Sequence, residues 1–239
     1  MGKQNENALI VFCRTPNIVR DDTHVHFSAL PWDDIDALFT AFIHDLLAVV
    51  SHLTRVDILV YRDSEEVADE FFFSFRRMIR LLDLDDKPYP EQVERAVHEA
   101  FQSGYLRVVT LLDNSPLISP KRLQHVFQQL TYEDDCIVVG PTEDGKCSLL
   151  GMKADYGKLF DSDNGDPTTK PNLLLQRICQ LDAHLFMLPS VLATDTAAGL
   201  AQLQEEIRKE TLASAEFPSQ TSEVLQKIEK KYSKRKGAR

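Results

Sequence analysis

The sequence is poor in glycine. Its 239 residues include nine glycines, and no two of them are separated by a single residue. Loops that cradle phosphates with their backbone usually need closely spaced glycines, as in the GxGxxG and GxxxxGK[ST] patterns. The absence of a GxG pair excludes the Rossmann fingerprint, and no segment of the sequence completes GxxxxGK[ST], which excludes the Walker loop.

Cysteine pairs are missing as well. The four cysteines lie far apart and form no CxxC pair, which argues against a zinc cluster and against a small disulfide scaffold. Cys13 and Cys136 stand in apolar runs. We expect both to be buried thiols, as in a reducing cytosol.

Long apolar runs are also absent. The longest one covers six residues, 8–13, whereas a helix needs about 20 apolar residues to cross a bilayer. Residues 1–7 are polar, which argues against a secretory signal peptide. We therefore expect a cytoplasmic protein with no membrane span.

The charge is unevenly distributed along the chain. The formal net charge is −10, but residues 227–239 carry +6 and the other 226 residues carry −16. A strongly acidic body argues against nucleic acid as a partner. The basic segment is either a frayed, solvated chain end or an electrostatic hook for nucleic acid or an acidic partner.

Hydrophobic patterning predicts strands that alternate with helices. The expected strands cover residues 8–13, 56–61, 106–112, 136–140, 147–152 and 184–188. The expected helices cover residues 33–53, 65–81, 90–102, 120–130, 173–181 and 197–209. Such alternation is typical of a three-layer α/β/α fold with a mostly parallel sheet. We expect one domain over residues 1–212 and a polar, basic tail over 213–239, partly helical or disordered.

Polar residues follow three of the expected strands, at residues 14–16, 113–116 and 140–145. In an open parallel sheet, ligands bind outside the carboxyl ends of the strands. An acid at such a strand end could hold a divalent cation, and the cation could hold a diphosphate. The same residues also suit plain turns, with Asp113 or Asn114 organising a turn, Ser115 and Pro116 starting a loop, and Glu143 to Gly145 forming a hairpin turn.

Four segments together resemble a known family. Residues 8–16, 111–120, 138–152 and 188–196 look like successive blocks of a poorly characterised bacterial family of glycosyltransferase-like proteins. That family has a GT-A fold, the fold of nucleotide-diphospho-sugar transferases. The resemblance covers residues 8–207 and implies a pocket for a nucleotide-sugar or nucleotide at the strand ends, usually with a divalent metal.

The resemblance implies roles for individual residues. Asp113 and Asp195 would bind Mg²⁺ or Mn²⁺, and Glu143 and Asp144 would be catalytic, orienting sugar or acceptor hydroxyls. The residues implied for nucleotide binding are Arg14, Pro16, Asn114, Ser115, Gly145 and Lys146.

The sequence departs from the family pattern at ligand positions. Val19 replaces a glycine, and Asp22 and His24 stand where the family has Lys and Arg. Asn114 and Ala193 replace aspartates, and Lys146 replaces the second glycine of Glu-Asp-Gly-Gly-Tyr. Two hypotheses follow: a metal-dependent glycosyltransferase or nucleotidyltransferase, or a catalytically inactive relative that binds a protein partner.

Overall fold

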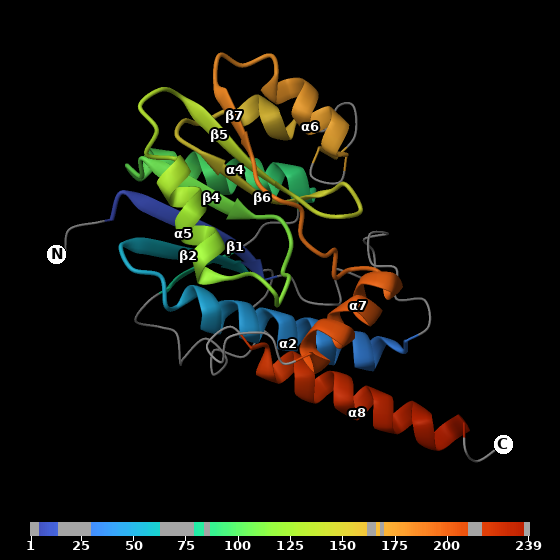
Figure 1. The fold of residues 1–239 in the computed structure, drawn as a ribbon. Coiled ribbons are helices and arrows are strands. Elements are labelled where there is room, and N and C mark those ends of the chain that lie inside the picture. The colour runs from blue at the N-terminus through green and yellow to red at the C-terminus, as the bar shows by residue number, and fades with distance from the viewer. Residues whose placement is uncertain are drawn as a thin grey trace.

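The chain is built around a seven-stranded sheet (Figure 1). The computed structural model describes residues 5–13, 30–62, 79–83, 87–161, 166–167, 170–209 and 217–236. The strands are β1 (Asn7–Cys13), β2 (Val56–Arg62), β3 (Ile79–Asp83), β4 (Arg107–Leu111), β5 (Cys136–Pro141), β6 (Cys147–Met152) and β7 (His184–Met187). Their order is β3-β2-β1-β4-β6-β5-β7, with β6 antiparallel to both of its neighbours and all other pairs parallel.

Helices cover both faces of this sheet. They are α2 (Trp32–Val50), α4 (Tyr89–Gln102), α5 (Pro120–Gln129), α6 (Pro171–Ile178), α7 (Ala197–Arg208) and α8 (Ser219–Lys236), with a 3₁₀ turn η1 (Gly157–Phe160). Leu9 and Val11 of β1 pack with residues of α2 and α5, whereas Ile10 and Phe12 pack with residues of α4, η1 and α6. This alternation follows from the two-residue period of a strand. The predicted three-layer α/β/α fold with a mostly parallel sheet is confirmed.

One predicted helix is wrong at its C-terminal end. The helix expected over residues 65–81 overlaps β3, which pairs with β2 in parallel from Ile79 onward. Residues 63–78 lie outside the described residues. The apolar residues of 79–82 suit a strand as well as a helix, and pairing with the edge of β2 decides between them.

One of the covering helices, α2, also packs against α7 and α8. α8 runs along α2 (Figure 1), and side chains of α2, α7 and α8 share a core that includes Leu38, Leu203 and Leu225. Within the described parts of the chain, no helix is both long and apolar enough to cross a membrane. The boundary expected at residue 212 stays a prediction, because residues 210–216 are not described.

Two buried aspartates of α2 hold α8. The Asp45 carboxylate accepts backbone hydrogen bonds from Gln220 N at 3.1 Å and Thr221 N at 2.8 Å, at the start of α8. Asp34 accepts from Lys231 Nζ at 2.7 Å and from Tyr232 Oη at 2.7 Å, about three turns further on. A carboxylate at a helix N-terminus satisfies N–H groups that have no partner within the helix.

Replacing Asp45 by alanine is expected to destabilise the protein by about 1–2 kcal/mol, the cost of losing a helix cap. The backbone N–H groups of Gln220 and Thr221 would lose their acceptor in a partly buried place. Urea denaturation followed by circular dichroism measures the change. Thr40→Ala, on the exposed face of the same helix, serves as the control and is expected to stay within about 0.5 kcal/mol of the parent.

Candidate functional site at the carboxyl edge of the sheet

Charged groups from three separate segments meet at one edge of the sheet. Asp113 follows β4, Asp144 and Lys146 lie in the turn between β5 and β6, and Asp195 precedes α7. The charges of Asp195, Lys146 and Asp144 all act on the Asp113 carboxyl group. The structure therefore brings together four of the residues implied by the family resemblance.

Lys146 is the central cation of this cluster. Its Nζ donates a hydrogen bond to Asp195 Oδ2 and lies 3.1 Å from Asp144 Oδ2. The exposed fractions of the three side chains are low, 25% for Lys146, 25% for Asp195 and 30% for Asp144. Water screens such pairs less than it screens fully exposed ones, so this bridge holds more firmly than an ordinary surface salt bridge.

The pairing shifts the pKa of both partners in the turn. Burial disfavours the charged form of Lys146, but the ion pairs with Asp195 and Asp144 outweigh it and raise its pKa. Burial also works against ionised Asp144, yet hydrogen bonds from Thr142 and Lys146 lower its pKa below the usual range. Lys146 and Asp144 are therefore both charged at neutral pH.

Asp113 behaves in the opposite way. Burial and the neighbouring charge of Asp195 raise its pKa to about 7, although Lys146 partly compensates. Asp113 as a whole residue is partly exposed to solvent. At neutral pH, Asp113 is thus poised between a neutral acid, which can donate a hydrogen bond, and a carboxylate.

The turn between β5 and β6 is a tight hairpin. Thr142 N donates to Lys146 O at 2.9 Å, Gly145 N donates to Thr142 O at 3.0 Å, and Gly145 has a φ of 87°. A positive φ favours glycine, because a Cβ would be strained there. The hairpin-turn interpretation of residues 143–145 is confirmed. The same turn places Lys146 where it contacts both Asp144 and Asp195. The Glu143 residue is exposed, while its backbone N donates to Val191 O at 2.8 Å.

Asn114 and Ser115 both make structural contacts. Asn114 Nδ2 donates to Phe12 O at 3.0 Å and so ties the loop after β4 to the end of β1. Ser115 is buried, and its Oγ accepts a hydrogen bond from Leu117 N at 3.3 Å. Their implied nucleotide contacts stay predictions, as do those of Arg14 and Pro16, which lie outside the described residues.

Asp195 lies directly before the N-cap residue of α7. The next residue, Thr196, caps this helix by accepting a hydrogen bond from Gly199 N at 3.0 Å. Gly199 lies so close to the backbone of Ala193 that a Cβ added to Gly199 would be 1.6 Å from Ala193 O. The segment 193–196 thus packs closely against the first turn of α7, and Asp195 of this segment contacts Lys146.

The donor set of this cluster does not fit a divalent cation as it stands. Mg²⁺ and Ca²⁺ need several oxygen ligands at about 2.0–2.6 Å, but the oxygens of Asp144 and Asp195 here converge on an ammonium group. Among the residues that the structure describes, no group of three or more His, Cys, Asp or Glu side chains is arranged to hold a metal ion. The metal roles of Asp113 and Asp195 stay predictions from the family resemblance.

Sequence reasoning missed two residues near this edge. Thr142 is buried, and its hydroxyl donates to Asp144 Oδ1 and so fixes that carboxylate. Arg122 of α5 donates a hydrogen bond from Nη2 to Pro189 O at 2.8 Å. The same Nη2 atom lies close to β5, since a Cβ added at Gly140 would be 3.2 Å from it. Burial lowers the pKa of Arg122. The hydroxyl two residues before Asp144 was a usable signal for Thr142, whereas nothing in the sequence links Arg122 to β5.

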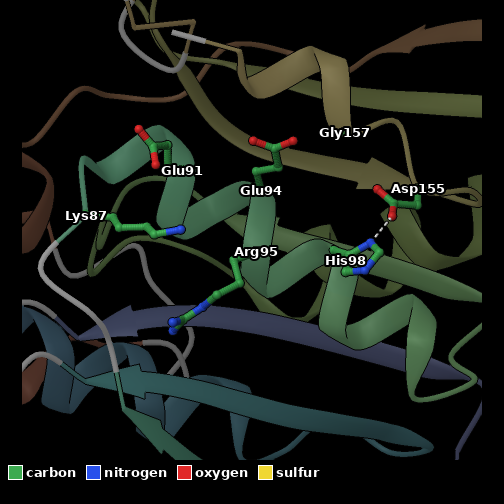
Figure 2. A pocket seen from close by; sticks show the side chains of 7 residues that line it. All are labelled: Lys87, Glu91, Glu94, Arg95, His98, Asp155 and Gly157. Carbon is green, nitrogen blue, oxygen red and sulfur yellow. Dashed lines mark hydrogen bonds and ion pairs between the residues drawn. The ribbon is translucent and has the colours of Figure 1, made fainter.

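A separate pocket lies on the outer side of α4 (Figure 2). Figure 2 shows the imidazole of His98 turned toward Asp155, with 2.6 Å between Nδ1 and Oδ2. The residues that line it are Lys87, Glu91, Glu94, Arg95, His98, Asp155 and Gly157. This lining mixes charges of both signs and includes none of the residues implied for nucleotide or metal binding.

Comparisons with known proteins agree with this architecture. Residues 46–164 match the sequence model of a family described as "Uncharacterized protein conserved in bacteria (DUF2064)". The resemblance to a poorly characterised bacterial family is thereby confirmed. No curated protein matches the sequence of the chain.

Solved structures share the fold. A protein classed as a nucleotide-diphospho-sugar transferase from Desulfovibrio desulfuricans G20 matches with a TM-score of 0.74 and 18% identity, over 94% of this chain and 96% of its own. A cytidylyltransferase from Leptospira borgpetersenii matches with a TM-score of 0.56 and 14% identity, over 95% and 94%. A 4-diphosphocytidyl-2C-methyl-D-erythritol synthase from Anaerococcus prevotii matches with 0.53 and 12%, over 82% and 95%. At such identities, the likeness shows a transferase-like fold.

Proposed function

We propose that this chain is a glycosyltransferase-like or nucleotidyltransferase-like protein that binds a nucleotide or nucleotide-sugar at the carboxyl edge of its sheet. The observation that carries the proposal is the convergence of Asp113, Asp144, Lys146 and Asp195 at that edge. Polar groups from separate segments that meet where strands end are typical of ligand sites in α/β sheets. The fold shared with nucleotide-diphospho-sugar transferases and cytidylyltransferases supports the choice of ligand.

The chemistry of each side chain suggests its role. Lys146 would offset negative charge on the phosphates of the ligand or leaving group. Asp144 and the exposed Glu143 would accept hydrogen bonds from sugar or acceptor hydroxyls. Asp113, with its pKa near 7, could donate or accept at the same edge and take part in proton transfer. Any Mg²⁺ or Mn²⁺ would have to displace Lys146 from Asp195.

A thermal-shift screen tests ligand binding. The protein is heated with each common nucleotide and nucleotide-sugar, in EDTA and with Mg²⁺ or Mn²⁺. A ligand at 100 times its dissociation constant stabilises the native state by about 2.7 kcal/mol, which is a rise of several degrees in Tm for a chain of this size. We expect one nucleotide class to give such a shift.

Asp113→Asn is expected to reduce that shift, and Asp182→Asn is the matched control. Asp182 is an exposed aspartate between α6 and β7, so its replacement changes the formal net charge equally without touching the cluster. No shift with any nucleotide, or an equal shift in both variants and the parent, would contradict the proposed site.

A second candidate function is a catalytically inactive relative that acts through a protein partner. The observation that favours it is the use of Lys146, Asp195 and the Asn114 amide in contacts within the chain. Turnover of a sugar nucleotide that disappears in Asp113→Ala would rule this candidate out. A protein that binds no nucleotide and hydrolyses none would support it.

A further inference from the structure

The Lys146 ammonium group lies between the carboxylates of Asp144 and Asp195 and pairs with both. We propose that its ammonium group takes the role of a divalent metal at the carboxyl edge of the sheet, so that Asp113, Asp144 and Asp195 bind no Mg²⁺ or Mn²⁺ while Lys146 is present. The exclusion of a metal ion by Lys146 does not depend on whether the protein binds a nucleotide. The corollary, that a nucleotide ligand binds here without a metal, rests on the proposed function.

The geometry of the bridge carries the proposal. One nitrogen contacts carboxylate oxygens from two segments far apart in the sequence, the 142–146 turn and the segment 193–196 that precedes α7. A metal ion that joined the same oxygens at about 2.0–2.6 Å would have to lie where the nitrogen lies. Ammonium and metal are therefore alternatives at this position, and the ammonium is tethered to the chain at high effective concentration.

Several contacts keep Lys146 in position. Its backbone O accepts a hydrogen bond from Thr142 N at 2.9 Å, and its backbone N donates to Asp144 Oδ1 at 3.4 Å. The Asp144 carboxylate is held in turn by the Thr142 hydroxyl. Because its backbone is already fixed, this lysine loses only side-chain freedom when its ammonium pairs, so the bridge forms at a low entropic cost and a metal ion must compete with it.

Removing the ammonium is expected to reverse the situation. Asp144 and Asp195 would face each other, with Asp113 nearby, and three carboxylates that share a site repel one another unless a cation joins them. Lys146→Met keeps most of the side-chain length and removes only the charged end. Lys146→Gly installs the residue that the resembling family has there and leaves room beside the carboxylates.

Titration of Mn²⁺ into the metal-free full chain, followed by electron paramagnetic resonance, tests the proposal. We expect no site in the parent at millimolar Mn²⁺, no site in Lys146→Arg, and one site in Lys146→Met or Lys146→Gly that binds at least about tenfold more tightly than any parent site. Lys158→Met, at an exposed lysine of η1, matches the change in net charge and should resemble the parent. Asp195→Asn combined with Lys146→Met should abolish the new site.

Two results would overturn the proposal. One is a single Mn²⁺ site in the parent that Asp195→Asn removes, and this result does not depend on whether any Lys146 variant folds. The other is a folded Lys146→Met or Lys146→Gly protein, verified by cooperative unfolding, that binds no Mn²⁺; Lys146 would then be a purely structural link. A nucleotide shift that appears only with metal would overturn the corollary alone, whereas no nucleotide shift under any condition counts against the proposed function.

Discussion

Asp113→Asn is expected to make the protein more stable at pH 8 and to leave its stability nearly unchanged at pH 4. The folded protein raises the pKa of Asp113 from 3.8 to about 7, chiefly by burial and then by the charge of Asp195. The folded state therefore binds a proton that the unfolded state has released between about pH 4 and 7. Stability falls as pH rises through this window and reaches its lowest contribution above pH 7.

The size of the effect follows from the same shift. Each pKa unit corresponds to 1.36 kcal/mol, and the partial exposure of Asp113 reduces the full value, so we expect a gain of about 1–3 kcal/mol at pH 8. Urea denaturation in EDTA at pH 4, 6 and 8 measures it. Titration of the other carboxylates affects parent and variant alike, so the difference between them isolates Asp113.

Asp182→Asn again supplies the control. This exposed aspartate is expected to show no difference from the parent that depends on pH. A variant at Asp113 that is less stable than the parent at pH 8 would mean that the ionised carboxylate is favoured in the folded protein.

Most of the fold could be predicted from the sequence, because burial on both faces leaves a clear signal. The apolar run of β1 lies inside the sheet, between β2 and β4, and the period of α2 marks the face that packs on it. The sequence did not predict β3, because this edge strand of five residues forms through its pairing with β2 rather than through a strong local preference. The attachment of α8 also left no local signal, because Asp34 and Asp45 bind residues almost 200 and 175 positions away.

The site could be predicted in part. Strand ends pointed to Asp113 and to the 142–146 turn, and the family resemblance added Asp195. The sequence did not indicate that Lys146 would bridge Asp144 and Asp195. In the sequence, Lys146 only stood out as a lysine where the resembling family has a glycine. Its partner Asp195 lies 49 residues away, and such a contact depends on tertiary packing rather than on a local pattern.

The backbone around Asp195 depends on a single glycine. Gly199→Ala is expected to destabilise the protein by about 3 kcal/mol or more, although alanine is the better helix former by about 1 kcal/mol. The new Cβ would stand 1.6 Å from Ala193 O and 2.8 Å from Ala193 C. Both are backbone atoms and cannot swing away, so either the segment 193–196 or the first turn of α7 must move.

Gly157→Ala separates this clash from the general effect of adding a methyl group. At Gly157 the nearest atom is Glu94 Oε1 at 3.1 Å, the end of a flexible side chain, and we expect a change within about 0.5 kcal/mol. Both variants are compared with the parent by urea denaturation. If the movement displaces Asp195, Gly199→Ala also loosens the bridge to Lys146, and the salt dependence of stability should weaken together with the stability itself. Equal stability of the two variants would show that the segment before α7 can shift freely, and that Asp195 is not held in place by close packing.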